Sequence, residues 1–153
     1  MGTVAAPTSK TVGPGKVASD GFRSCYQHTS AGALFAASNF VALGTDATMQ
    51  KQLAGLVAPG AGHDALEQQL EGGTSSTATQ RAQIAGYKVD SYNGTDATVD
   101  LAINYSDGTL VSLPLKLTWL SGDWKVVVAD DGSMPIPPAQ LQSLGGYTPW
   151  SGA

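Results

Sequence analysis

Residues 82–131 limit what this chain can fold into more than any other part of the sequence. They contain four runs rich in β-branched, aromatic and leucine residues, and a short glycine-containing turn separates each run from the next. Asn-Gly and Asp-Gly are strong hairpin signals, because type I′ turns need two residues that tolerate positive φ. We therefore predict four consecutive antiparallel strands, joined by turns at Asn93-Gly94, Asp107-Gly108 and Ser121-Gly122-Asp123.

The predicted strands alternate between apolar and polar side chains, which is typical of a sheet with one buried face. Val99, Leu101 and Ile103 share one face of the second strand, and large apolar residues fill every second position of the third from Val111 onward. Pro114 interrupts the third strand. Because proline cannot donate a ladder hydrogen bond, we expect a bend or bulge there. The four strands are predicted at residues 83–92, 97–105, 109–120 and 124–129.

Before the strands, apolar residues recur at helical spacing. Capping residues and helix-ending glycine or proline bound each segment. The three predicted helices are one that begins at Thr29 or Ser30 and stops at Gly44, one capped by Thr45 or Asp46 and ended by Pro59-Gly60, and one over residues 63–71. With the strands, they predict an α+β fold in which N-terminal helices cover the apolar face of a curved, four-stranded antiparallel meander.

The remaining segments predict irregular structure. Residues 1–21 carry proline and glycine among serine, threonine and lysine and indicate a flexible arm, which leaves residues 22–153 as a single domain. Residues 72–79 form a polar loop. After Asp131 three prolines argue against further strands, and residues 138–144 favour a short helix with Leu141 and Leu144 inward. Two aromatic residues near the C-terminus, Tyr147 and Trp150, indicate a tail that docks on the domain.

Charge excludes one class of partner. The formal net charge is -4, the pI is about 4.8, and the eight basic residues are scattered along the chain. Such a surface does not match the phosphate backbone of a nucleic acid. The single cysteine, Cys25, excludes an internal disulfide framework and a multi-cysteine metal site. Residues 1–19 lack a basic start followed by an apolar run, so the chain is either cytoplasmic or part of a protein whose membrane anchor precedes Met1.

Two groups of residues invite a catalytic or metal-binding interpretation. Cys25 and His28 are three positions apart, but no orienting Asn or Asp is signalled, so a half-buried thiol and a capping or surface histidine are expected. His63, Asp64 and Glu67 resemble metal ligands at helical spacing. With only two distant histidines and no second cluster, an acidic helix N-terminus is the expected role of this group.

The acidic and aromatic residues of the strands give weaker signals. Asp90 and Asp100 on strands, and the pair Asp130-Asp131 after the fourth strand, lack any spacing that would fix an acid–base pair. No nucleophile elbow and no phosphate-binding glycine loop occurs in the sequence. Aromatic residues that could line a ligand pocket are more often core residues, and here they are Tyr87, Tyr92, Tyr105, Trp119 and Trp124. The residues thus predict no catalytic, metal or cofactor site.

Several motifs resemble known families. Helices followed by a meander that ends in Gly122-Asp123-Trp124-Lys125-Val126 resemble the cone-shaped fold of nuclear transport factor 2-like domains. Together with that corner, three further motifs look like an actinobacterial domain family associated with integrative and conjugative elements: Tyr26-Gln27-His28-Thr29-Ser30-Ala31-Gly32-Ala33-Leu34, Gln83-Ile84-Ala85-Gly86-Tyr87 and Gly146-Tyr147-Thr148-Pro149-Trp150. The resemblance begins at about Phe22.

This resemblance implies an extracytoplasmic domain that a transmembrane helix anchors in the full-length protein. It further implies kinship with the assembly subunit of type IV secretion systems, a protein-interaction scaffold without an active site. The expected partners are other subunits of a cell-envelope transfer complex, with a homo-oligomer possible. The alternative is a small-molecule binder or an isomerase or cyclase of the same fold, which would use Asp90 or Asp100 with Tyr87 or Tyr105.

Overall fold

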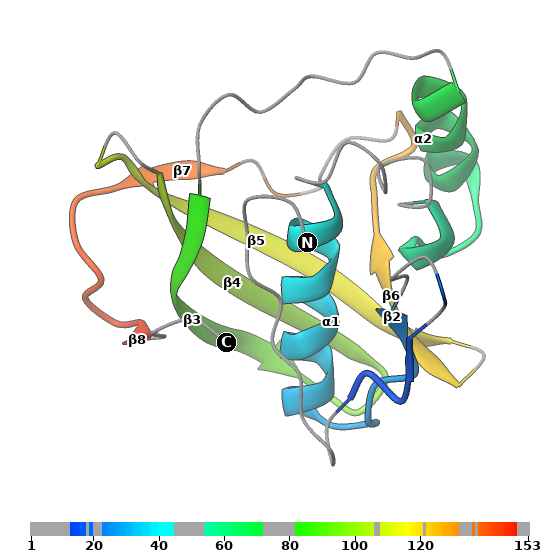
Figure 1. The fold of residues 1–153 in the computed structure, drawn as a ribbon, viewed down its shortest axis with the longest axis horizontal. Coiled ribbons are helices and arrows are strands. Elements are labelled where there is room, and N and C mark those ends of the chain that lie inside the picture. The colour runs from blue at the N-terminus through cyan, green and yellow to red at the C-terminus, as the bar shows by residue number, and fades with distance from the viewer. Residues whose placement is uncertain are drawn as a thin grey trace.

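The computed structural model describes residues 13–17, 19, 23–44, 54–71, 82–105, 108–120, 122–131, 136 and 138–149. They form an α+β structure in which two helices accompany a mainly antiparallel sheet (Figure 1). The α+β class predicted from the sequence is thereby confirmed. Neither helix is long and apolar enough to cross a membrane.

The predicted hairpins form the body of the sheet. The strand order is β6-β5-β4-β3-β8, and β7 also pairs with β5. Glycines with positive φ lie in the three predicted turns, at Gly94, Gly108 and Gly122. The bounds are β3 Ala82–Tyr92, β4 Asp96–Tyr105, β5 Leu110–Leu120, β6 Asp123–Val127, β7 Ala139–Leu141 and β8 Thr148–Pro149. The sheet therefore has six strands among the described residues, where four were predicted.

Of the bend or bulge expected at Pro114, the bulge is absent. β4 and β5 pair without a register shift from Asp96↔Thr118 to Asn104↔Leu110, and Pro114 lies opposite Asp100. On its other edge β5 pairs with β7 at residues 110–112 and with β6 at residues 116–120. Pro114 thus faces the gap between these two partners, where its missing N–H costs no ladder bond. The register shifts occur instead in β3, between Ile84 and Gly86 and between Val89 and Ser91.

The C-terminal region contradicts the prediction of a short helix over residues 138–144. Residues 139–141 form strand β7, which is antiparallel to the start of β5. β6 covers only the second half of β5, so the first half has a free edge that β7 fills. The tail does dock, as predicted: Thr148–Pro149 forms β8 beside Gly86 and Tyr87. Trp150 lies outside the described residues.

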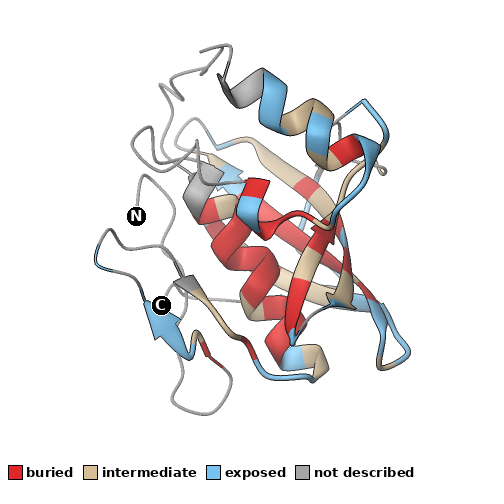
Figure 2. Cartoon of the chain, turned by 90° about the vertical axis from the view of Figure 1, so that its right-hand side faces the viewer, coloured by how far each residue is buried: buried red, intermediate tan, exposed pale blue. Residues whose placement is uncertain are grey.

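The first predicted helix is confirmed as α1, Ser30–Gly44. Thr29 caps it, because its Oγ1 accepts a hydrogen bond from the Gly32 amide at 3.0 Å. Glycine is required at position 32, where a Cβ would lie 1.7 Å from the Gln27 carbonyl oxygen. The helix is buried almost all round from Ala33 to Ala42, as Figure 2 shows by its red colour. It therefore occupies the core rather than covering the sheet with one stripe.

The third predicted helix is confirmed as α2, Ala61–Glu71, two residues longer at its start than expected. The predicted second helix falls mostly on residues 45–53, outside the described part. Its last residues, 54–56, form a short 3₁₀ turn, and Val57 makes a parallel bridge to Val126. The polar loop at residues 72–79 also lies outside the described residues.

A short ribbon lies within and beside the predicted arm. β1, Lys16–Val17, pairs antiparallel with β2, Arg23–Ser24. The Gly15 amide donates to the Cys25 carbonyl at 2.7 Å, and Gly13 packs close to Tyr26. This part of the N-terminal region is thus attached to the segment that leads into α1. Of the predicted arm, residues 13–17 and Ser19 are described, and the others lie outside the described part.

The core lies between α1 and one face of the sheet, which we call the inner face. Leu101, Leu115, Leu117 and Trp124 are at most 2% exposed there. The opposite, outer face carries Asp100, Ala102 and Ser112, and these residues are also buried. Something other than α1 must therefore cover part of the outer face.

Candidate functional site

The segment before α1 is held by one carboxylate rather than by a thiol–imidazole pair. Oδ2 of Asp123 accepts the Cys25 amide at 2.7 Å, and Oδ1 accepts the Tyr26 amide at 2.9 Å. Cys25 is half-buried and has a φ of 66°, a left-handed conformation that non-glycine residues rarely adopt. Asp123 was predicted only as a turn residue. Its role depends on contacts about 97 positions apart in the chain, which no local sequence signal reveals.

His28 packs in an aromatic cluster instead of forming a catalytic pair with Cys25. Its ring stacks on Trp119 with centroids 4.0 Å apart and planes within 1°, and its Nε2 contacts the Gly94 carbonyl oxygen. Trp124 meets both rings edge-on. Tyr92, which is 41% exposed, packs beside Trp124. The cluster joins the start of α1 to two hairpins at one end of the sheet, and it holds its members by ring packing without a catalytic arrangement.

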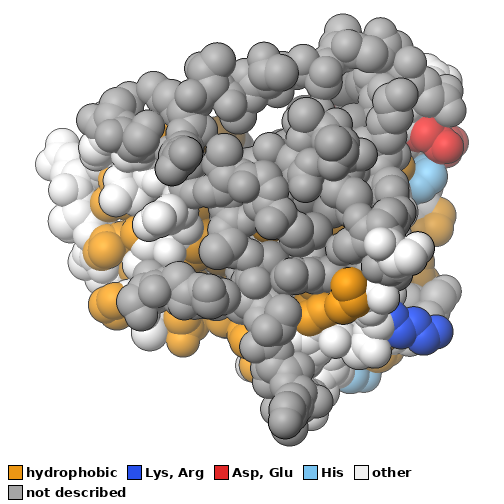
Figure 3. Space-filling model, viewed as in Figure 1, with side chains coloured by type: hydrophobic (Ala, Val, Ile, Leu, Met, Phe, Trp, Pro, Cys, Tyr) orange, Lys and Arg blue, Asp and Glu red, His pale blue; other side chains and the backbone are white. Residues whose placement is uncertain are grey.

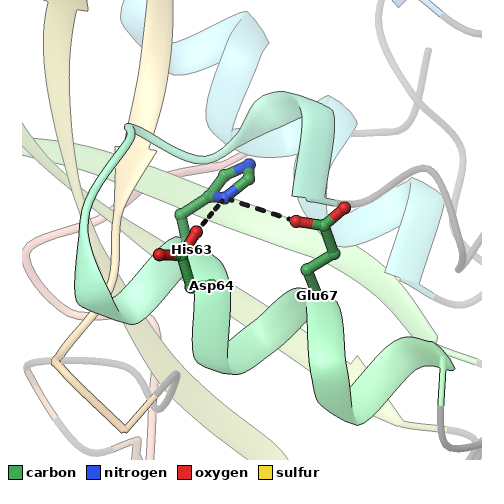
Figure 4. Close-up of side chains that lie close together, drawn as sticks. All are labelled: His63, Asp64 and Glu67. Atoms are coloured by element: carbon green, nitrogen blue, oxygen red, sulfur yellow. Dashed lines mark hydrogen bonds and ion pairs between the residues drawn. The ribbon is translucent and has the colours of Figure 1, made fainter.

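His63, Asp64 and Glu67 lie together on the first turns of α2 (Figure 4). Nδ1 of His63 is 3.4 Å from Asp64 Oδ1 and 3.8 Å from Glu67 Oε2. Both carboxylates are exposed, and the three possible ligand atoms come from a single helix. This arrangement agrees with an acidic helix N-terminus that stabilises α2. Nothing further in the described residues completes a coordination shell around it.

A second buried carboxylate, besides that of Asp123, belongs to Asp100 on the outer face of the central strand β4. Its Oδ1 accepts the Ser112 hydroxyl at 2.7 Å, and its Oδ2 accepts the Tyr147 hydroxyl at 2.7 Å. Asp100 is 5% exposed because the C-terminal segment crosses over it. Sequence reasoning placed Asp100 on the polar face of its strand but did not connect it with Tyr147. Two features of the sequence could have indicated the contact between Asp100 and Tyr147: the alternation of the strand and the expected docking of the tail.

Lys88 completes this polar group. Its Nζ lies 3.9 Å from Asp100 Oδ2, 3.8 Å from Asp90 Oδ1 and 4.8 Å from the centroid of the Tyr147 ring. Burial raises the pKa of the Tyr147 hydroxyl above its ordinary value of 10.0; a hydrogen bond with Ser112 opposes this rise, and the carboxylate of Asp100 adds to it. Tyr147 is therefore a neutral donor to Asp100 at physiological pH.

The proposed isomerase-like residues do not converge. Lys88, Asp100 and Pro114 lie in one cross-strand row on the outer face, whereas Tyr87 is paired with Leu101 and packs against the core. Tyr105 also packs against the core. A carboxylate of Asp100 and the ring of Tyr87 thus lie on opposite faces of the sheet. Asp130 and Asp131 are exposed in the turn after β6.

Apolar side chains remain exposed at the edge and ends of the sheet. Among the described residues the large ones in this sheet are Val89, Tyr92 and Leu120, and Val17 is exposed in the short ribbon β1–β2. Figure 3 shows orange, hydrophobic side chains on the lower left of the face that it displays. The charged side chains visible on this face lie on its right. A hollow opens on the surface between β4, β5 and β6, lined by Asp96, Thr98, Lys116 and Val127 among others. It contains no histidine, cysteine or paired carboxylates.

Comparison with known families matches nearly the whole chain. The family model described as "Domain of unknown function (DUF8175)" covers residues 1–149. The chain belongs to this family. No curated protein and no solved structure matches the chain significantly. The DUF8175 match includes the first 21 residues, which the sequence resemblance left outside the domain.

Proposed function

We propose that this domain is a non-enzymatic protein-interaction scaffold, the extracytoplasmic part of a membrane-anchored component of a conjugative DNA-transfer or type IV secretion-like apparatus. We further infer a cone-shaped, nuclear transport factor 2-like fold. The resemblance of the four motifs supports the assignment to such an apparatus. The filling of the inner face supports the scaffold role over a ligand-binding one.

The inner face is where enzymes and binders of this fold type hold their ligands, and here side chains fill it. Leu101, Leu115 and Trp124 are each at most 2% exposed, and α1 packs against four strands on this side. A small-molecule site of ordinary size needs a cavity of roughly 300–1,000 Å³. The packing of α1 against these side chains favours a domain that acts through its surface.

The alternative function, a small-molecule binder of the isomerase or cyclase type, has one observation in its favour. The Asn39 side chain on α1 is fully buried, and among the described residues neither its nitrogen nor its oxygen has a hydrogen-bond partner. An unpaired buried amide costs about 1–3 kcal/mol, so such groups call for a bound water or ligand. Against this function, Asp100 faces the other side of the sheet and is already bonded to Ser112 and Tyr147.

Co-purification from the native host tests the scaffold function. A tagged full-length protein should recover other envelope subunits of the transfer apparatus, and deletion of its gene should abolish or strongly reduce DNA transfer. A matched control is the same protein with Asp130→Ala, at an exposed carboxylate, which should recover the same subunits as the original protein. Normal transfer after gene deletion would contradict the proposal.

Substitution of Asn39 separates the two functions. Asn39→Leu keeps the branched shape and the number of side-chain heavy atoms and removes the unpaired amide, so we expect the stability to change little. A scaffold should then recover its partners as well as the original protein does. A ligand-binding domain should lose both its ligand and its activity in DNA transfer. The readouts are thermal melting, partner recovery and transfer frequency, measured on the same variant.

A further inference from the structure

The outer face of the sheet carries a surface that fits an extended polypeptide. We call this surface, which consists of Asp100 and the small residues beside it, the track. Gly86, Ala102 and Ser112 form a cross-strand row of small residues over β3, β4 and β5. Ala102 is completely buried although it points away from α1. Residues 139–149, which we call the strap, run from β7 on one side of the sheet to β8 on the other and bury this row (Figure 1).

The close fit depends on the absence of a side chain at Gly86. A Cβ there would lie 3.0 Å from the Thr148 carbonyl oxygen, 3.2 Å from Cβ of Tyr147 and 3.5 Å from Cδ2 of Leu144. The backbone of the strap can therefore approach the sheet directly. A side chain at this position would push the strap away from the sheet by a few tenths of an ångström, so the glycine favours the close approach of the strap.

Few contacts attach the strap to the sheet. β7 pairs three residues and β8 pairs two, of which Pro149 has no N–H. Leu141, Leu144 and Tyr147 are half-buried, and the other strap residues are exposed. Among the described residues, the side-chain hydrogen bonds between the strap and the sheet are those of the Tyr147 hydroxyl with Asp100 and Ser112. Elements with so few buried contacts open locally well before the whole domain unfolds.

The polar group beneath the strap does not depend on the strap for its arrangement. Ser112 already donates to Oδ1 of Asp100, and Lys88 lies beside Oδ2, so the carboxylate stays oriented and compensated when Tyr147 leaves. The Asp100 carboxylate can then accept a hydrogen bond from a hydroxyl group, and Lys88 favours an aromatic ring by a cation–π contact. A side chain with both a hydroxyl group and an aromatic ring is a tyrosine, so the track selects a tyrosine in an extended segment.

We propose that the strap exchanges between two copies of this chain, so that the tyrosine of one copy docks on the Asp100 track of the other. The chain's own C-terminal segment carries the matching chemistry, and a second copy presents it with every contact unchanged. Such reciprocal exchange closes a symmetric dimer at little cost, because each lost contact is replaced by an identical one. The inference adds a partner, a second copy, to the proposed scaffold, and its test does not involve the transfer apparatus.

Complementary variants test the exchange. Tyr147→Phe removes the donor from the strap, and Asp100→Ala removes the acceptor from the track, so neither variant alone contains an intact pair. Each should run as a single chain of 15.6 kDa in size-exclusion chromatography with light scattering. An equimolar mixture should give a complex of twice that mass, because the strap of the Asp100→Ala chain meets the intact track of the Tyr147→Phe chain.

Controls keep this result specific. A mixture of the Tyr147→Phe chain with a chain that carries both substitutions should stay at the single-chain mass. Circular dichroism checks the folding of each variant, and Asp100→Leu, which also lacks an acceptor, replaces Asp100→Ala if the latter does not fold. A labelled peptide of residues 139–149 should bind the Tyr147→Phe chain about tenfold more tightly than the same peptide with phenylalanine at the tyrosine position. Single-chain mass in every mixture would overturn the exchange, and equal binding of the two peptides would overturn the selection of tyrosine by the track.

Discussion

At the scale of single residues, the Asp123 carboxylate decides how the N-terminal segment joins the sheet. It accepts the amides of Cys25, Tyr26 and Trp124, at 2.7–2.9 Å. Hydrogen bonds to an ionised carboxylate are about twice as strong as neutral ones. They hold Cys25 in its left-handed conformation and direct Tyr26 into the core, where it is 4% exposed.

We expect Asp123→Ala to destabilise the domain by about 2–4 kcal/mol, because it leaves the amides of Cys25 and Tyr26 without their acceptor. Asp123→Asn should cost less, since its amide oxygen still accepts one or two of these bonds. Urea unfolding followed by tryptophan fluorescence measures both variants. Asp130→Ala, at an exposed carboxylate, should change the unfolding free energy by no more than about 0.5 kcal/mol. Equal effects at positions 123 and 130 would contradict the role of Asp123.

At the scale of elements, the strap and the sheet are joined through a titratable hydroxyl. Burial raises the pKa of Tyr147 in the folded state, so the neutral phenol is favoured there. A group with a raised folded pKa contributes stability that is complete below its unfolded pKa, about 10, and is lost as the pH rises through the folded pKa. The strap should therefore hold at neutral pH and loosen only in alkaline solution.

Ultraviolet titration near the tyrosinate band tests this expectation. The difference between the original chain and Tyr147→Phe should show one tyrosine that titrates above pH 10. The advantage in melting temperature of the original chain over the variant should be constant below about pH 10 and shrink above it. Tyr105→Phe, on the inner face, is the matched control and should leave the titration of Tyr147 unchanged. A difference spectrum that titrates below pH 10 would refute the buried Tyr147–Asp100 contact.

The elements that could be predicted from the sequence are those with local causes. Glycine turns at positions 94, 108 and 122 mark the hairpins, and Thr29 marks the start of α1. β7 could not be predicted, because residues 139–141 become a strand only where β6 leaves half of β5 unpaired. For the same reason Pro114 does not break β5. The Tyr147–Asp100 contact, 47 positions apart, required the pairing of the sheet and the path of the tail together.

At the scale of the whole molecule, α1 and the centre of the sheet form one packed unit. α1 contacts β3, β4, β5 and β6, and β4 is buried on both faces over most of its length. β3, by contrast, lies near the edge of the sheet, carries two register shifts and presents Lys88 and Asp90, features that discourage further strand pairing. Stability should therefore be highest along α1 and β4 and lowest in the strap.

Native-state hydrogen exchange should show this order directly. Leu101→Ala removes a side chain that is 0% exposed and should cost about 2–5 kcal/mol. Because α1, β4 and β5 share this core, their slowest amides should all lose protection by the same free energy. Tyr147→Phe should instead lower protection in residues 139–149 and leave α1 unchanged. Leu120→Ala, a leucine that is 38% exposed, is the control and should alter protection little. If Leu101→Ala loosened β4 but not α1, the helix would be a separately stable element, and the single core described for this domain would be wrong.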